Sequence, residues 1–231
     1  MLKDSYHGAS TSVICEQRPG NKITGIIESA TRELLPLPIT GLVLAGGRSR
    51  RMGRPKEFLS FGGTTLVEHL LSVSREMFSE VYLVTNEPES FSHLTDAVVK
   101  DILPYRGPLG GILSGLLVAA HPYAFVIPCN MPLVNGRLIR QMAAHRHDTD
   151  VLVLSHKTGV EPLLGIYSKN CIKPMEESLF SGQQKVGTFL SGVAVKLFPY
   201  PDDLANRSDL PAYFNVNTPQ DYSAILTRSH R

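Results

Sequence analysis

The sequence has few features of a secreted or membrane protein. Its 231 residues include only three cysteines, which are widely spaced and form no CxxC pair, so neither a disulfide framework nor a structural zinc site is expected. No apolar run approaches the roughly 18 residues of a membrane span, and the polar N-terminus lacks the apolar core of a secretory signal. We therefore expect a soluble, cytoplasmic protein without a membrane partner.

Net charge of one sign is also scarce. The formal charge is +2, so no global basic field favours nucleic acid as a partner. Positive charge is instead concentrated in the segment GLVLAGGRSRRMGRPK at 41–56, where four arginines and a lysine follow an apolar run. Internal repeats and low-complexity tracts are absent from the sequence. We therefore expect a globular domain with a local anion-binding site in this basic segment.

Short apolar runs alternate with amphipathic stretches from Ile39 onward, in what reads as strict strand and helix alternation. This pattern is typical of crossover units and predicts an α/β fold, a single doubly wound, mostly parallel and Rossmann-like sheet covered on both faces. We place this domain at 39–231. Residues 1–38 form an N-terminal extension, loose except for a helix expected at 23–35 that prolines terminate.

The basic segment is a candidate phosphate-binding loop of neither common type. It lacks the spacing of a P-loop and of a GxGxxG turn. Gly46 and Gly47 would let backbone N–H groups approach a ligand, while Arg51 and Lys56 bring cationic donors to the same place. A polyphosphate would satisfy all of them, whereas the alternative is a solvated basic loop. Its position after the first strand favours a ligand, because ligands of such sheets bind at the carboxyl ends of the strands.

The same segment carries a family resemblance. Leu44-Ala45-Gly46-Gly47, then Arg51-Met52-Gly53 and Lys56, resemble the LAGGxxxRMGxxK signature of the nucleotidyltransferase superfamily, and most closely its MobA family of molybdenum cofactor guanylyltransferases. Five more motifs follow in that family's order: LVTN, DILPYRGPLGGILSGL, PCNMP, VEPLLGIYS and FNVNTPQDY. The resemblance covers residues 39–226. The motifs GPLGGI and FNVNTPQD resemble those of the family members that transfer guanylyl groups. The first motif alone would also fit cytidylyl or uridylyl transfer.

The resemblance implies a magnesium-dependent nucleotidyltransferase that joins GMP from GTP to molybdopterin and releases pyrophosphate. The Rossmann-like sheet would then be a nucleotidyltransferase fold. Besides GTP and molybdopterin, the implied partners are proteins of molybdenum cofactor maturation and the molybdoenzymes they serve. A molybdopterin cytidylyltransferase or another NTP transferase is the alternative within the enzyme class.

The resemblance also implies roles for particular residues. Lys56 and Arg51 would be the catalytic cations, because charge accumulates on the leaving β- and γ-phosphates. Asn215 and Asn217 would lie near the molybdopterin acceptor. The nucleotide would be bound by the backbone of Leu44, Ala45, Gly46 and Gly47 and by Lys56, Asn86 and Asp101.

Asp101 suits guanine by its chemistry. A carboxylate can accept from the N1–H and N2–H donors of guanine, which adenine lacks at those positions. The structural alternative is an aspartate that ends a strand and caps the next helix.

Position 130 departs from the family, which usually has an aspartate metal ligand where this sequence has Asn130. Magnesium prefers hard oxygen ligands, and an amide offers a carbonyl oxygen without charge. Three interpretations stay open: a weaker metal site that still works, a site rebuilt around another carboxylate with Asp101 first, or a GTP-binding relative that has lost catalysis.

Overall fold

The computed structural model describes residues 35–46, 55–95, 97–201 and 210–227. The chain divides into two compact units, Met1–Leu35 and Pro36–Arg231, and all described residues except Leu35 belong to the second. The helix expected at 23–35, apart from its last residue, lies outside the described residues. The first strand begins at Leu37, slightly ahead of the expected domain start at Ile39.

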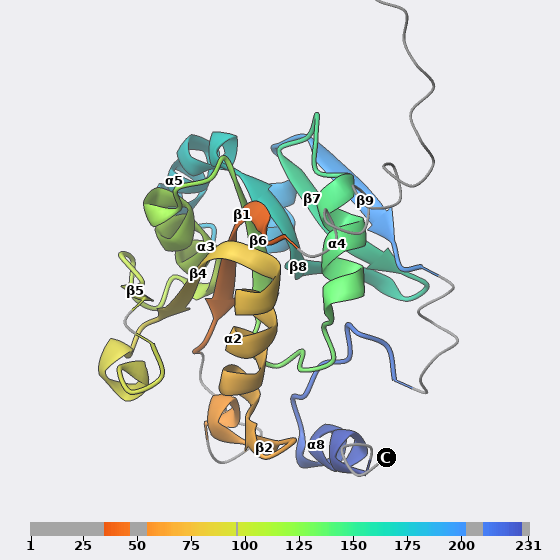
Figure 1. Ribbon diagram of the computed structural model, residues 1–231. Helices are drawn as coiled ribbons and strands as arrows, with labels where there is room; N and C mark the ends of the chain where they lie inside the picture. The colour runs from red at the N-terminus through yellow and green to blue at the C-terminus, as the bar shows by residue number, and fades with distance from the viewer. Residues whose placement is uncertain (1–34, 47–54, 96, 202–209, 228–231) are drawn as a thin grey trace, which may run out of the picture. The chain divides into compact units, whose positions relative to one another are not determined.

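A seven-stranded sheet in the order β5-β4-β1-β6-β8-β7-β9 forms the centre of the second unit (Figure 1). Every pairing is parallel except the two made by β8, with β6 and with β7. The predicted mostly parallel α/β sheet is therefore confirmed. Its strands are β1 (Leu37–Leu44), β4 (Phe78–Thr85), β5 (Val98–Lys100), β6 (Tyr123–Pro128), β7 (Val151–His156), β8 (Gly159–Ser168) and β9 (Val195–Pro199).

Helices cover both faces of this sheet, as expected for a doubly wound fold. On one face α2 (Leu66–Met77) and α4 (Gly136–Ala144) pack in one hydrophobic cluster, and both lie in front of the sheet in Figure 1. A second cluster holds α3 (Gly107–Val118), α5 (Ile172–Phe180) and α6 (Val186–Leu190). Strand residues divide between the clusters by alternation, because successive side chains of a strand point to opposite faces.

The strict alternation of strands and helices is wrong, most clearly between β7 and β8. β7 and β8 follow one another without a helix and pair antiparallel, joined by a two-residue turn at Lys157 and Thr158. Antiparallel neighbours need only a tight turn, whereas parallel neighbours need a crossover. The two apolar runs DVLVLS and PLLGIYS therefore form a hairpin, which puts the one antiparallel strand beside β6.

The C-terminal segment packs on a small hairpin, away from the large sheet. Helix α8 (Pro219–Leu226) starts with Thr218 as its N-cap and Pro219 in its first turn, and Asp221 completes a capping box. Tyr222 donates its hydroxyl to the carbonyl of Ser60 in β2 (Ser60–Phe61) over 2.8 Å, and α8 lies beside β2 in Figure 1. The hairpin is completed by β3 (Thr64–Thr65). This packing fixes where the asparagines just before α8 lie.

Three single-turn 3-10 helices complete the described structure: η1 (Lys56–Phe58), η2 (Pro88–Phe91) and η3 (Lys169–Cys171). Within the described ranges, no helix is long and apolar enough to cross a membrane.

Candidate functional site: a cleft at the carboxyl edge of the sheet

The parallel strands β1, β4, β5 and β6 end at one edge of the sheet, and the loops that follow them line a cleft of about 930 Å³. A volume of this size is in the range of sites for small ligands and cofactors. The cleft brings together most of the residues that the sequence singles out: Leu44, Ala45, Gly46, Lys56, Asn86, Asp101 and Asn130. Gly47 and Arg51 lie outside the described residues.

Backbone hydrogen bonds continue beyond the strand ends and hold the lining loops in register. The N–H of Ala45 donates to Val84, that of Cys129 to Leu44 and that of Asp101 to Thr85, all over 2.9–3.0 Å. Gly46 then turns the chain at φ 145°, a conformation that side-chain-bearing residues rarely adopt. The first glycine of the signature therefore meets a local backbone requirement at the edge of the cleft.

Asp101 is almost fully buried at one end of the cleft. Its Oδ1 accepts hydrogen bonds from the Leu103 N–H at 3.0 Å and from the Ser114 hydroxyl at 3.1 Å, while Oδ2 makes none among the described residues. Room for the carboxylate comes from Gly110, where a Cβ would lie 3.2 Å from Oδ1. Burial raises the pKa of Asp101, and the two hydrogen bonds partly oppose the shift. One oxygen thus anchors α3, and the other is left for a ligand.

Asn86, which follows β4, shapes the rim beside Asp101. Its Oδ1 accepts the N–H of Tyr105 at 3.3 Å, and Tyr105 has a left-handed φ of 62°, unusual for an aromatic residue. The Tyr105 side chain is exposed and also lines the cleft. Sequence patterns did not single out this tyrosine, since only the backbone conformation marks it.

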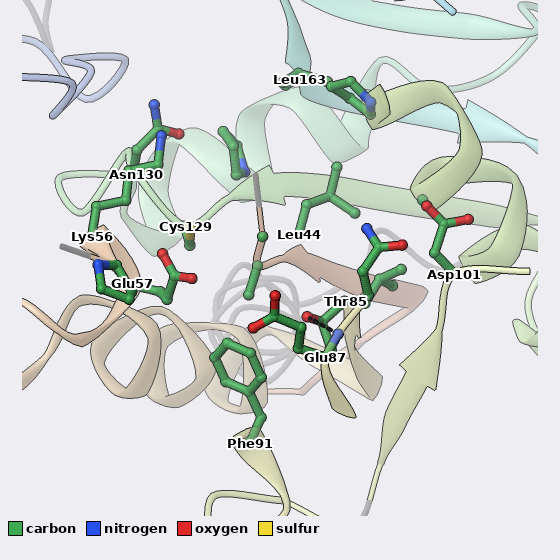
Figure 2. Close-up of a pocket in the computed structure, with 18 of the residues that line it drawn as sticks. Leu44, Lys56, Glu57, Thr85, Glu87, Phe91, Asp101, Cys129, Asn130 and Leu163 are labelled. Carbon is green, nitrogen blue, oxygen red and sulfur yellow. Dashed lines mark hydrogen bonds between the residues drawn. The ribbon is translucent and has the colours of Figure 1, made fainter. Parts of the chain in front are cut away.

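Lys56 and Asn130 lie together at the other end of the cleft, with Leu44 between them and Asp101 (Figure 2). The Lys56 ammonium donates to Oδ1 of Asn217 at 3.3 Å, and the Asn130 amide donates to the same oxygen at 3.0 Å. Asn217 and Asn215 therefore join the site through side-chain contacts. The two positions that the sequence offered for a metal ligand, Asn130 and Asp101, are at opposite ends and cannot both serve one ion.

Glu57 is a cleft residue that sequence reasoning missed. It follows Lys56 in η1 and is 8% exposed, and its buried Oε2 has no hydrogen-bond partner among the described residues. Figure 2 shows its carboxylate between Lys56 and Glu87, near Cys129. A buried carboxylate oxygen without a partner is costly and is usually explained by a ligand or ion. The available signal was a charged residue in the otherwise apolar run EFLSF.

Cys129 lies next to Asn130 and is buried. Burial raises the pKa of its thiol to about 11, and the nearby Glu57 carboxylate adds to the shift. A thiol with so high a pKa stays neutral near pH 7 and is poorly suited to be a nucleophile.

The fold and the cleft define a class of protein. The cleft lies at the carboxyl edge of a mostly parallel α/β sheet. It has a lysine at one end and, at the other, a carboxylate that uses only one of its oxygens for hydrogen bonds among the described residues. This arrangement suits an elongated phosphorylated ligand. Residues 41–196 match the MobA-like NTP transferase domain, and the chain belongs to that family. It thus carries a nucleotidyltransferase domain.

Relatives of known name agree with this assignment. A protein of Carboxydothermus hydrogenoformans named a probable molybdenum cofactor guanylyltransferase is 37% identical over 81% of this chain and 95% of its own length. The molybdenum cofactor guanylyltransferase of Desulfosudis oleivorans is 30% identical over 79% of this chain and 92% of its own.

The fold is similar to that of a solved structure as well. Molybdopterin-guanine dinucleotide biosynthesis protein A from Archaeoglobus fulgidus superposes with a TM-score of 0.71 at 24% identity, over 81% of this chain and 96% of that one.

Proposed function

We propose that this protein transfers GMP from GTP to molybdopterin in the cytoplasm, forming the guanine dinucleotide cofactor and pyrophosphate. The observation that carries the proposal is the two-ended cleft of a MobA-like domain, with Lys56 and Asp101 at opposite ends. The names of the relatives supply the acceptor and the base. Maturation proteins and molybdoenzymes would receive the product.

The chemistry requires positioning of groups and no nucleophilic side chain. A phosphate oxygen of molybdopterin attacks the α-phosphorus of GTP, a new P–O bond forms, and the bond from the α-phosphorus to the bridging oxygen breaks. Negative charge then accumulates on the departing pyrophosphate, where the Lys56 ammonium can stabilise it. Asn86, the backbone of Leu44 to Gly46 and the free Oδ2 of Asp101 would hold the nucleoside end. Arg51 is proposed to share the role of Lys56 on the evidence of the sequence alone.

The cleft fits a divalent cation that is bound mainly through phosphates. No three His, Cys, Asp or Glu side chains of the described ranges come together as a metal site, but magnesium in nucleotide sites commonly takes one or two carboxylates with phosphates and waters. The unpartnered oxygen of Glu57 supports this residue as the charged ligand at the Lys56 end. Asn130 could add only its neutral Oδ1, and Asp101 lies at the wrong end. When bound, magnesium would neutralise charge on the leaving phosphates.

The direct experiment measures pyrophosphate release with GTP, magnesium and molybdopterin. Release that requires both GTP and molybdopterin is the expected result, with CTP at least about tenfold poorer. A preference for CTP would favour the cytidylyltransferase alternative. GTP binding without any release would favour the relative that binds GTP but lacks catalysis, and would refute guanylyl transfer.

Glu57→Gln is expected to weaken metal binding to the GTP complex by at least about tenfold, the loss typical when groups around a metal are changed. Electron paramagnetic resonance of Mn²⁺ measures this directly and independently of turnover. Without nucleotide, the variant should also be at least as stable in urea as the original protein, because the change replaces a buried negative charge by a neutral amide of the same shape.

Glu87→Gln is the matched control, since Glu87 is a second carboxylate of the same cleft. It should leave Mn²⁺ affinity nearly unchanged. If Glu87→Gln weakens the metal and Glu57→Gln does not, the assignment of Glu57 is wrong.

A further inference from the structure

Asn130 joins two parts of the cleft that are far apart in sequence. Its Nδ2 donates to Oδ1 of Asn215 at 2.9 Å and to Oδ1 of Asn217 at 3.0 Å, and its backbone carbonyl accepts the N–H of Val216 at 2.8 Å. These bonds tie the end of β6 to the segment before α8. We call this set of three asparagines, Asn130, Asn215 and Asn217, the asparagine clasp.

Two neighbouring groups, one that can only donate and one that can only accept, decide which way the amides of the clasp point. The Lys56 ammonium can only donate, so Asn217 must present its oxygen to it. The carbonyl of Tyr213 can only accept, so Asn215 turns its Nδ2 toward that carbonyl, at 3.4 Å, and its oxygen toward Asn130. Residue 130 therefore faces two acceptor oxygens and must donate to both.

With Asn215 and Asn217 oriented in this way, an amide fits position 130 better than a carboxylate of the same shape. An ionised carboxylate has no N–H or O–H to donate, so it would confront two carbonyl oxygens. It would also offer the Lys56 ammonium an ion-pair partner inside the cleft, in competition with a ligand phosphate. The neutral side chain at position 130 thus matches its surroundings in this chain.

We propose that Asn130 is a positioning residue, which acts through Asn217 to keep Lys56 oriented and available for the triphosphate of the nucleotide. The asparagine is then a matched part of this cleft, and not a weakened version of an acidic metal ligand. The inference rests on the proposed function only in taking GTP as the ligand.

The test compares the same amide-to-acid change at two positions. Asn130→Asp should lower the urea midpoint of unfolding, because both clasp bonds lose their donor. Asn135→Asp is the control. Among the described residues the Asn135 side chain caps α4 as an acceptor, from the Leu138 N–H at 3.1 Å, and a carboxylate can do the same. Its urea midpoint should be unchanged or slightly higher.

Measurements of nucleotide binding distinguish the positioning role of Asn130 from a role in stability alone. In EDTA, without metal or acceptor, Asn130→Asp should weaken GTP binding roughly 5- to 100-fold and GMP binding little, because the effect passes through Lys56 and the outer phosphates. In a Lys56→Ala background the same change should cause a clearly smaller loss of GTP affinity, because the part that passes through Lys56 is already gone and only repulsion between the new carboxylate and the phosphates is left. Calorimetry measures the GTP dissociation constants of the original protein, the two single variants and the double variant, and the GMP dissociation constants of the original protein and Asn130→Asp.

Two results would overturn the proposal. One is an Asn130→Asp variant with unchanged stability and unchanged GTP affinity in EDTA but tighter binding of Mn²⁺, which would make residue 130 a metal-ligand position. The other is a full additional loss in the Lys56→Ala background. If the original protein fails to bind GTP at all, the proposed function fails, whereas the urea comparison of Asn130→Asp with Asn135→Asp still tests the clasp.

Discussion

Replacing Lys56 by alanine is expected to weaken GTP binding by roughly 10- to 150-fold and to leave GMP binding almost unchanged. A charge-assisted hydrogen bond contributes about 1.5–3 kcal/mol, and here it is lost only when β- and γ-phosphates are present. Among the described residues the ammonium donates to the neutral Oδ1 of Asn217, at the long distance of 3.3 Å. A phosphate oxygen is a stronger acceptor than this amide, so the oriented ammonium gains a stronger hydrogen bond when the nucleotide binds.

Calorimetry with GTP and GMP measures this difference. Lys173→Ala is a suitable control, because Lys173 is an exposed lysine of α5 and does not line the cleft. It should change neither affinity. Equal weakening of GTP and GMP by Lys56→Ala would mean that Lys56 supports the fold of η1 or contacts another part of the nucleotide.

GTP is expected to bind at least about tenfold tighter than ATP, because a two-donor contact to a base edge contributes about 1–3 kcal/mol of discrimination. The free Oδ2 of Asp101 is the group that would accept from guanine N1–H and N2–H. Asp101→Asn should abolish the preference and keep the fold. The asparagine Oδ1 can still accept from Leu103 and Ser114, while an NH₂ group replaces the acceptor that faces the base.

The preference should also depend on pH in a defined direction. Burial raises the pKa of Asp101, so its ionised form is lost at a higher pH than for an ordinary aspartate. The GTP preference should be full above that raised pKa and fall as pH drops through it. Equal dissociation constants for GTP and ATP in the original protein, at any pH above that range, would rule out guanine reading by Asp101.

Much of the fold could be predicted from local patterns. Apolar runs of strand length alternate with amphipathic stretches, and the polar motifs directly follow those runs at Leu44, Thr85, Lys100 and Pro128. Because the carboxyl ends of parallel strands share one edge, these local patterns suffice to place Gly46, Asn86, Asp101 and Asn130 around one cleft. The β7–β8 hairpin was missed because two adjacent apolar runs do not reveal whether their strands pair antiparallel.

The sequence by itself determined the class of sheet, the edge at which the cleft lies and the family, since each depends on short-range spacing. Only the tertiary structure decided which side chains meet there. Asn130 contacts residues 85 and 87 positions later, and Lys56 contacts one 161 positions later, because α8 packs back on the β2–β3 hairpin. It likewise separated Asp101 from Asn130 and left Glu57 with an unpartnered oxygen. Such contacts arise from packing between distant segments, which no local pattern in the chain records.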